Sequence, residues 1–137
     1  MTRLYVDTSA YLCLLLGERG SAALEKEFSG SQLLSSVLLV LEADRNLIRL
    51  LRQGLLSEDE CRECQARLDA DIGYFLLRDL TLDLSREGIM PAISIPRSLD
   101  LAHLRTALWF HRSEAIDRFV TMDQVQTQSA KELGLPV

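Results

Sequence analysis

Carboxylic acids stand at the ends of two short apolar runs in this 137-residue sequence. Asp7 directly follows the run at 4–6, and Asp123 follows the run at 118–122. Short apolar runs favour strands that are covered on both faces, as in a parallel sheet. In such sheets the chemistry gathers at the carboxyl ends of the strands. Both acids are therefore candidate site residues, although each can instead cap the helix that follows it, and Asp123 with Gln126 resembles a capping box.

Glu42 and Asp44 are acids within a predicted helix that is otherwise largely apolar in its first half. Leu38 lies one turn before Glu42, so the acid shares a helix face with apolar side chains. A buried carboxylate without a partner is expensive, which makes an acid on this face a candidate for a functional site. Spacing does not choose between the two acids, because Asp44 has equivalent apolar neighbours. For either acid, a salt bridge to Arg45 or Arg49 is the structural alternative.

Asp100 lies in the first turn of the helix predicted by the segment SLDLAHLRTAL. The helix dipole favours an acid there for purely structural reasons. His103 and His111 follow on the same face, so a metal site made of Asp100 and histidine is one interpretation. The two histidines are about two helical turns apart, however, which is too far for both to bind one ion.

The acids are more informative together than singly. Asp7 and Asp123 lie at strand ends, Asp100 lies in a first helical turn, and one further acid lies on an apolar helix face. If these groups converge, each raises the pKa of the others unless a cation neutralises them. Mg²⁺ and Mn²⁺, hard divalent cations that prefer oxygen ligands, meet that need. Such ions activate water and stabilise the leaving oxygen in phosphodiester hydrolysis, so the pattern predicts a metal-dependent hydrolytic site.

Strands and helices are expected to alternate along the chain. Strands are predicted at 4–6, 33–36, 74–80 and 118–122, and helices at 9–16, 20–28, 37–53, 81–88, 98–112 and 124–132, with a further helix opening at Ser57. Residues 90–98 are predicted to form a loop, and the last two residues a tail or a short edge strand. This alternation predicts an α/β fold with a mostly parallel sheet and helices on both faces.

Several helix starts have recognisable capping residues. Thr8 or Ser9 can cap the helix at 9–16. Ser57 and Glu60 form the pattern of a capping box, and Ser98 is expected to cap the helix at 98–112. Because Thr8 and Ser9 are available as caps, we expect Asp7 to be free for another role.

The bulk properties fit one domain. No apolar run approaches the roughly 20 residues of a membrane span. No basic segment of the kind that begins a signal peptide precedes Asp7, and the three cysteines, an odd number, do not indicate a disulfide framework. A cytoplasmic protein is the simplest expectation. The net charge of −5 disfavours non-specific nucleic-acid binding, yet all but Lys26 and Lys131 of the 15 basic residues are arginines, which suit phosphate contacts or reflect a GC-rich genome.

Four features of the sequence resemble PIN-domain proteins, and most closely the VapC-type toxin ribonucleases of prokaryotic toxin–antitoxin pairs. They are YVDTSAYL, Glu42 early in a long apolar helix, SLDLAHLRTAL, and FVTMDQVQTQSAKELGLPV. Their order and spacing agree with the family over nearly the whole chain. The Asp-Thr-Ser near the start and the Leu-Gly-Leu-x-Val ending are the most specific parts, whereas residues 55–95 carry little of the pattern.

The resemblance implies a single PIN-like domain over 1–137, a three-layer α/β/α fold, and an endoribonuclease that depends on Mg²⁺ or Mn²⁺. It carries the catalytic and metal-binding acids onto Asp7, Glu42, Asp100 and Asp123. The resemblance, and not the spacing, thus prefers Glu42 over Asp44. It also gives Ser9 and Thr121 as hydroxyls that support the site through hydrogen bonds.

Partners follow from the same resemblance. It implies an RNA substrate, such as tRNA or rRNA, a small antitoxin protein that covers the active site, and a homodimer. Many family members have a further acid just after the position of Asp123, and Val125 stands about there in this chain. We therefore expect one well-held ion in the absence of substrate.

Two other functions are compatible with the sequence. The missing acid at Val125 is compatible with a non-catalytic PIN-fold module that binds RNA or a protein partner. A phosphotransfer receiver is also a parallel α/β domain with strand-end acids. YVDTS, however, has one Asp where a receiver has an acidic pair, and no lysine lies near the fourth strand.

Other conspicuous residues have structural explanations. Cys61 and Cys64 form a Cys-x-x-Cys within a predicted helix and lack the second pair that a zinc site would need, so we expect packing roles. Tyr11, Trp109 and Phe110 are able to stack on bases, but core or dimer packing is the simpler interpretation.

Overall fold

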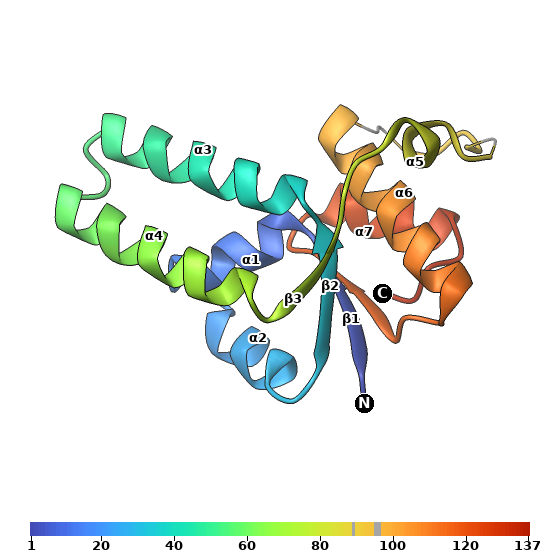
Figure 1. Ribbon diagram of the computed structural model, residues 1–137, viewed down its shortest axis with the longest axis horizontal. Coiled ribbons are helices and arrows are strands. Elements are labelled where there is room, and N and C mark those ends of the chain that lie inside the picture. Colours follow the sequence, from blue (N-terminus) through green and yellow to red (C-terminus); the bar gives the residue numbers. More distant parts are fainter. Residues whose placement is uncertain (89, 95–96) are drawn as a thin grey trace.

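The computed structural model describes residues 1–88, 90–94 and 97–137 and has three layers, with helices on both faces of a central sheet (Figure 1). The predicted α/β class and the α/β/α layering are confirmed. Of the loop predicted at 90–98, residues 95 and 96 lie outside the described residues, and residues 90–94 form neither helix nor strand.

The sheet has four strands in the order β3-β2-β1-β4, and every pairing between them is parallel. The strands are β1 (Arg3–Val6), β2 (Gln32–Ser36), β3 (Phe75–Arg78) and β4 (Arg118–Val120). The two strands predicted at 74–80 and 118–122 are therefore shorter than expected. Each ends where its neighbour ends, because Arg78 pairs with Ser36 and Val120 pairs with Val6.

The chain beyond α7 forms no strand, so the tail at 136–137 is the correct one of the two alternatives. A hydrogen bond from the Phe119 N–H to the Pro136 carbonyl, over 2.7 Å, joins the tail to the sheet.

Alternating strand residues build two cores, one on each face of the sheet. Leu4, Val6, Leu33 and Val120 face the first core, together with residues of α1 (Thr8–Leu15), α2 (Ser21–Phe28), α3 (Leu38–Arg52) and α4 (Glu58–Ile72). Tyr5, Leu34 and Phe119 face the second core, with residues of α6 (Ser98–Ser113) and α7 (Gln124–Glu132). The short α5 (Leu82–Arg86) packs against α6. In Figure 1 the first group of helices lies on the left of the sheet and the second group on the right.

The start of α1 differs from the prediction. Asp7, and not Thr8 or Ser9, is the N-cap: its backbone is extended and its carboxylate accepts a hydrogen bond from the Ala10 N–H. Thr8 and Ser9 already belong to the helix, and their hydroxyls bond to other partners. The expectation that these two residues free Asp7 from capping is therefore wrong.

The capping predictions for the starts of α4 and α6 differ in outcome. The capping box of Ser57 and Glu60 at α4 is confirmed, with both reciprocal hydrogen bonds present. The prediction for Ser98 is wrong, because Ser98 is the first residue of α6 and Arg97 occupies the cap position without a side-chain cap bond. Among the described residues, no helix is both long and apolar enough to cross a membrane.

The core contribution of β2 can be tested with one pair of leucines. Leu34, on β2, is fully buried in the second core, whereas Leu41 on α3 is 67% exposed. We expect Leu34→Ala to lower the free energy of unfolding by about 2–5 kcal/mol, because it removes buried apolar surface and leaves a cavity. Leu41→Ala is the matched control and should change it by less than about 0.5 kcal/mol in urea unfolding. Equal losses in the two variants would contradict the described core.

Candidate functional site

The carboxyl edge of the sheet brings the four predicted acids to one pocket. β1 and β4 are adjacent and parallel, and the Asp7 N–H continues their pairing by donating to the Val120 carbonyl over 3.1 Å. Two residues, Thr121 and Met122, separate the end of β4 from Asp123. The pocket has a volume of about 180 Å³, and its lining consists of Asp7, Thr8, Ser9, Leu12, Glu42, Asn46, Asp100, His103 and Asp123.

Asp7 is buried and is held through one oxygen. Its Oδ1 accepts hydrogen bonds from the Ser9 hydroxyl at 2.7 Å and from the Ala10 N–H at 3.1 Å. Burial raises the pKa of Asp7, while His103 and the hydroxyls of Thr121 and Ser9 oppose that rise. The Asp7 carboxyl thus lies at a place where a charge is costly, and it serves as a helix cap at the same time.

Ser9 and Thr121 connect the two strand ends. Their hydroxyl oxygens lie 3.1 Å apart, and the Ser9 oxygen also accepts from the Met122 N–H at 3.0 Å. The Thr121 oxygen accepts from the Asp123 N–H at 3.1 Å. These bonds join the turn after β1 to the turn after β4, so the two hydroxyls fix the separation between Asp7 and Asp123.

Glu42 reaches the pocket from the first half of α3. Its Oε1 accepts hydrogen bonds from the Thr8 hydroxyl at 2.7 Å and from His103 Nε2 at 2.9 Å. Burial by itself raises the pKa of Glu42, but the bonds and attraction of His103, the Thr8 hydroxyl and the charge of Arg45 outweigh burial, and the pKa is lowered. Asp44 does not line this pocket. Asp44 is two residues after Glu42, which corresponds to a rotation of about 200° around the helix axis. The two side chains therefore leave α3 on nearly opposite sides.

Asp123 caps α7, as its sequence context allowed. Its Oδ1 accepts from the Val125 N–H at 2.8 Å and from the Gln126 N–H at 3.4 Å. The second half of the expected capping box is not formed, because the Gln126 amide donates instead to the Asp100 carbonyl at 3.0 Å. Gln126 thereby ties the start of α7 to the start of α6.

Asp100 is the least restrained of the four acids. Its carboxylate faces the exposed Arg97 guanidinium at 3.7 Å. Burial raises the pKa of Asp100, the charges of Asp123 and Glu42 raise it further, and Arg97 and His103 oppose them. The repulsion expected among converging carboxylates therefore acts on Asp100 in this structure.

A common arrangement links three of the acids. Asp7, Glu42 and Asp123 each accept two hydrogen bonds on one oxygen, and within residues 1–88, 90–94 and 97–137 the second oxygens of Glu42 and Asp123 accept none. Carboxylate oxygens that accept no hydrogen bond are the ligands that a hard divalent cation prefers. No three His, Cys, Asp or Glu side chains of the described ranges are clustered as a ready metal cage. An Mg²⁺ ion fits such an open set, because it commonly takes one or two carboxylates and completes its shell with waters and phosphate.

The two histidines of α6 have separate surroundings. His103 is buried and contacts Glu42, Thr8 and Tyr5, and sequence reasoning did not assign it this place. Its position one turn after Asp100 was the available signal. His111 instead accepts a hydrogen bond from the Ile116 N–H at 3.1 Å, so it stabilises the turn after α6. The interpretation of a shared metal site for the two histidines gains no support.

The remaining conspicuous residues pack. Tyr11, Phe110 and Cys61 are buried in the two cores, and all three cysteines are free. Trp109 packs beside the second core with the Arg78 guanidinium 4.5 Å from its ring centre.

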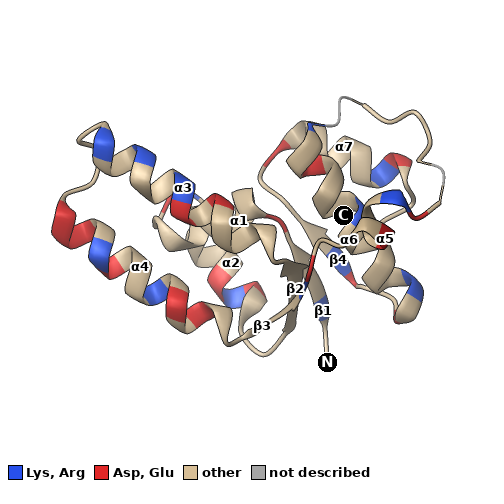
Figure 2. Ribbon diagram, turned by 45° about the horizontal axis from the view of Figure 1, so that its top comes forward, with Lys and Arg blue, Asp and Glu red and all other residues tan. Residues whose placement is uncertain are grey.

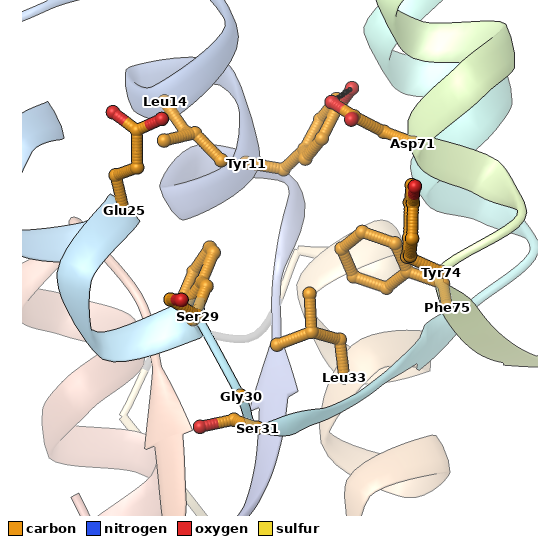
Figure 3. Close-up of a pocket in the computed structure, with 11 residues that line it drawn as sticks. Tyr11, Leu14, Glu25, Ser29, Gly30, Ser31, Leu33, Asp71, Tyr74 and Phe75 are labelled. Atoms are coloured by element: carbon orange, nitrogen blue, oxygen red, sulfur yellow. Dashed lines mark hydrogen bonds between the residues drawn. The ribbon is translucent and has the colours of Figure 1, made fainter.

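A larger hollow, of about 390 Å³, lies elsewhere. Residues before and at the start of β2 and β3 line it, together with parts of α1, α2 and α4. Figure 3 shows Tyr11 and Asp71 pointing toward one another at its wall, where the tyrosine hydroxyl donates to the carboxylate over 2.8 Å. Its lining is mainly apolar, and it sits at the amino ends of the strands, away from the four acids. Chemistry and not size therefore makes the acidic pocket the candidate site.

Comparisons of the chain with protein-family models and with curated proteins find no match.

The double role of Asp7 gives a prediction about stability. Asn retains an oxygen that can cap α1, whereas Ala does not, so in metal-free buffer Asp7→Asn should exceed Asp7→Ala in free energy of unfolding by about 0.5–2 kcal/mol. Because burial raises the folded-state pKa of Asp7, Asp7→Asn should also be at least as stable as the unaltered protein at pH 7. The difference in stability between Asp7→Asn and the unaltered protein should shrink as the pH is lowered. It should vanish below about pH 4, where the carboxyl group is protonated in the unfolded chain too.

Urea unfolding of the three proteins between pH 4 and 7 measures both effects. A difference between Asp7→Asn and the unaltered protein that grows toward low pH would contradict the assigned burial.

Proposed function

We propose that this chain is a metal-dependent endoribonuclease, a PIN-domain protein of the VapC type that acts as the toxin of a toxin–antitoxin pair. The observation that carries the proposal is the pocket shared by Asp7, Glu42, Asp100 and Asp123 at the carboxyl edge of a parallel sheet. The resemblance in sequence names these same four positions. The α/β/α layering agrees with the family but is common to many functions, so it adds little by itself.

The acids would hold Mg²⁺ or Mn²⁺ through oxygens that are not engaged in hydrogen bonds. When bound, the ion supplies Lewis-acid activation of water and stabilises negative charge in the transition state. Asp7 and Asp123 are fixed relative to one another by Ser9 and Thr121. Asp100 is our candidate for accepting the proton of the attacking water, because its one ion pair among the described residues is the long contact to Arg97 at 3.7 Å and its carboxylate accepts no hydrogen bond from them.

Arginines beside the pocket would grip the RNA. The charge of Arg45 acts on Glu42 and that of Arg97 acts on Asp100, so basic groups from α3 and from the start of α6 flank the acids. In Figure 2 the acidic positions of α3 lie at its end next to α1, and basic positions continue along the helix. Because the whole chain carries a net charge of −5, such local contacts would have to hold the phosphate backbone.

The remaining parts of the proposal concern partners and location. The protein would work as a homodimer in the cytoplasm, on a tRNA or rRNA substrate. A small antitoxin would inhibit it by placing a basic side chain among the acids, since an excess of carboxylates in one pocket attracts a cation from a partner.

Cleavage of a structured RNA tests the proposal. With Mn²⁺ or Mg²⁺ the purified protein should cut the RNA internally, and EDTA should stop the reaction. Asp7→Asn and Asp123→Asn should each lower the rate at least about 100-fold, because each removes a charged ligand while an amide oxygen can still cap the helix. Asp44→Asn is the matched control, because Asp44 lies on α3 but does not line the pocket. Its cleavage rate should stay within about threefold of that of the unaltered protein.

Full activity of Asp7→Asn, or cleavage that persists in EDTA, would refute the metal-dependent mechanism. A second candidate function is favoured by Val125, which is partly exposed where many family members carry a further acid. It is a non-catalytic module, and binding of RNA or antitoxin with no cleavage in any divalent metal would favour it instead.

A further inference from the structure

His103 is a buried histidine in the middle of a polar network. It lies on α6, is 2% exposed, and contacts residues from three other elements. Its Nε2 lies 2.9 Å from Glu42 Oε1 and 3.0 Å from the Thr8 hydroxyl, and its Nδ1 lies 2.8 Å from the Tyr5 hydroxyl. A buried histidine with both nitrogens engaged has a fixed ring orientation.

The partners determine where the hydrogens lie. Glu42 Oε1 already takes the hydrogen of the Thr8 hydroxyl, and a carboxylate oxygen in such a contact only accepts. His103 Nε2 must therefore carry a hydrogen and donate it to Glu42. The Thr8 hydroxyl donates its one hydrogen to the same Glu42 oxygen, over 2.7 Å. In its contact with His103 Nε2, the Thr8 oxygen is therefore the acceptor.

Two donors thus converge on a single oxygen of Glu42. Within the described ranges of the chain, Oε2 accepts no hydrogen bond, while Glu42 lines the acidic pocket. A carboxylate restrained in this way has one oxygen anchored in the protein and the other available to a ligand.

We propose that His103 is a positioning residue, which holds Glu42 by its Oε1 and so presents Oε2 to a divalent cation in the pocket. This inference rests on the proposed function, because it concerns the same acids. It assigns no direct contact between His103 and substrate or metal. Thr8 is the second residue that holds Glu42 by its Oε1. Neither His103 nor Thr8 is one of the four acids.

Tyr5 connects this anchor to the centre of the sheet. Its side chain is fully buried on β1, stacks on Phe119 with ring centres 5.3 Å apart, and meets the His103 ring edge-on at 5.9 Å. The chain of contacts therefore runs from β4 through β1 and α6 to α3. A packing role alone would account for a buried ring, but it would not require a donor on the nitrogen that faces Glu42.

Two amide variants separate positioning from packing. The amide nitrogen of Gln can take the place of His103 Nε2, whereas Asn is one methylene shorter and keeps only a group near the position of Nδ1. We expect His103→Asn to weaken Mn²⁺ binding by about 10–100-fold in calorimetry of the metal-free protein. His103→Gln should stay within about threefold of the unaltered protein. In RNA cleavage the loss in His103→Asn should fall on kcat, with KM changed less than about threefold.

The ring itself provides a measurement that needs no variant. Long-range ¹H–¹⁵N correlations of the intact metal-free protein should show a hydrogen on His103 Nε2. A ring without it would overturn the proposal, even if both variants fail to fold. Unaltered Mn²⁺ binding in a folded His103→Asn protein would overturn it as well, and so would equal losses in folded His103→Asn and His103→Gln.

These outcomes are separable from the fate of the proposed function. If the unaltered protein binds Mn²⁺ and does not cleave RNA, the ribonuclease proposal fails while the contrast between Asn and Gln still decides the role of His103. If it cleaves RNA and His103→Asn binds Mn²⁺ normally, the ribonuclease proposal stands and the positioning role fails. Absence of Mn²⁺ binding in the unaltered protein would overturn both.

Discussion

Hydrogen bonding to one oxygen of each carboxylate is the constraint on which the candidate site depends. A carboxylate at a partly buried sheet edge needs donors, and Asp7, Glu42 and Asp123 find theirs in helix N–H groups, hydroxyls and an imidazole. Because these donors use only one oxygen each, the acids are fixed and still chemically available. Capping and ligand binding are therefore compatible roles of the same side chain, and a helix cap is no argument against a site.

The parallel sheet supplies the geometry for this arrangement. β1 and β4 end side by side, which sets Asp7 near Asp123, and Ser9 with Thr121 joins the two turns. The acids from α3 and α6 come from opposite faces of the sheet and meet above its edge. No single helix or strand therefore carries the site, and loss of the β1–β4 pairing would separate its acids.

The sequence predicted those parts of the molecule that depend on local patterns. The strand positions, the alternation with helices and the capping box at Ser57 follow from residues close together in the chain. The cap of α1 was assigned wrongly because three consecutive polar residues can all cap, and the choice among them depends on distant partners such as Glu42. Likewise, His103 contacts Tyr5, 98 residues away in the chain, and no spacing along α6 reveals that contact.

The choice of Glu42 over Asp44 has a similar origin, since it depends on how α3 is rotated about its axis by packing. The four carboxylates are proposed to act together on one divalent cation. A crystal structure in Mn²⁺, with anomalous scattering collected at the manganese edge, provides the sharpest test. A manganese peak is expected in the pocket of Asp7, Glu42, Asp100 and Asp123. An empty pocket at millimolar Mn²⁺, or manganese bound only elsewhere on the molecule, would contradict it.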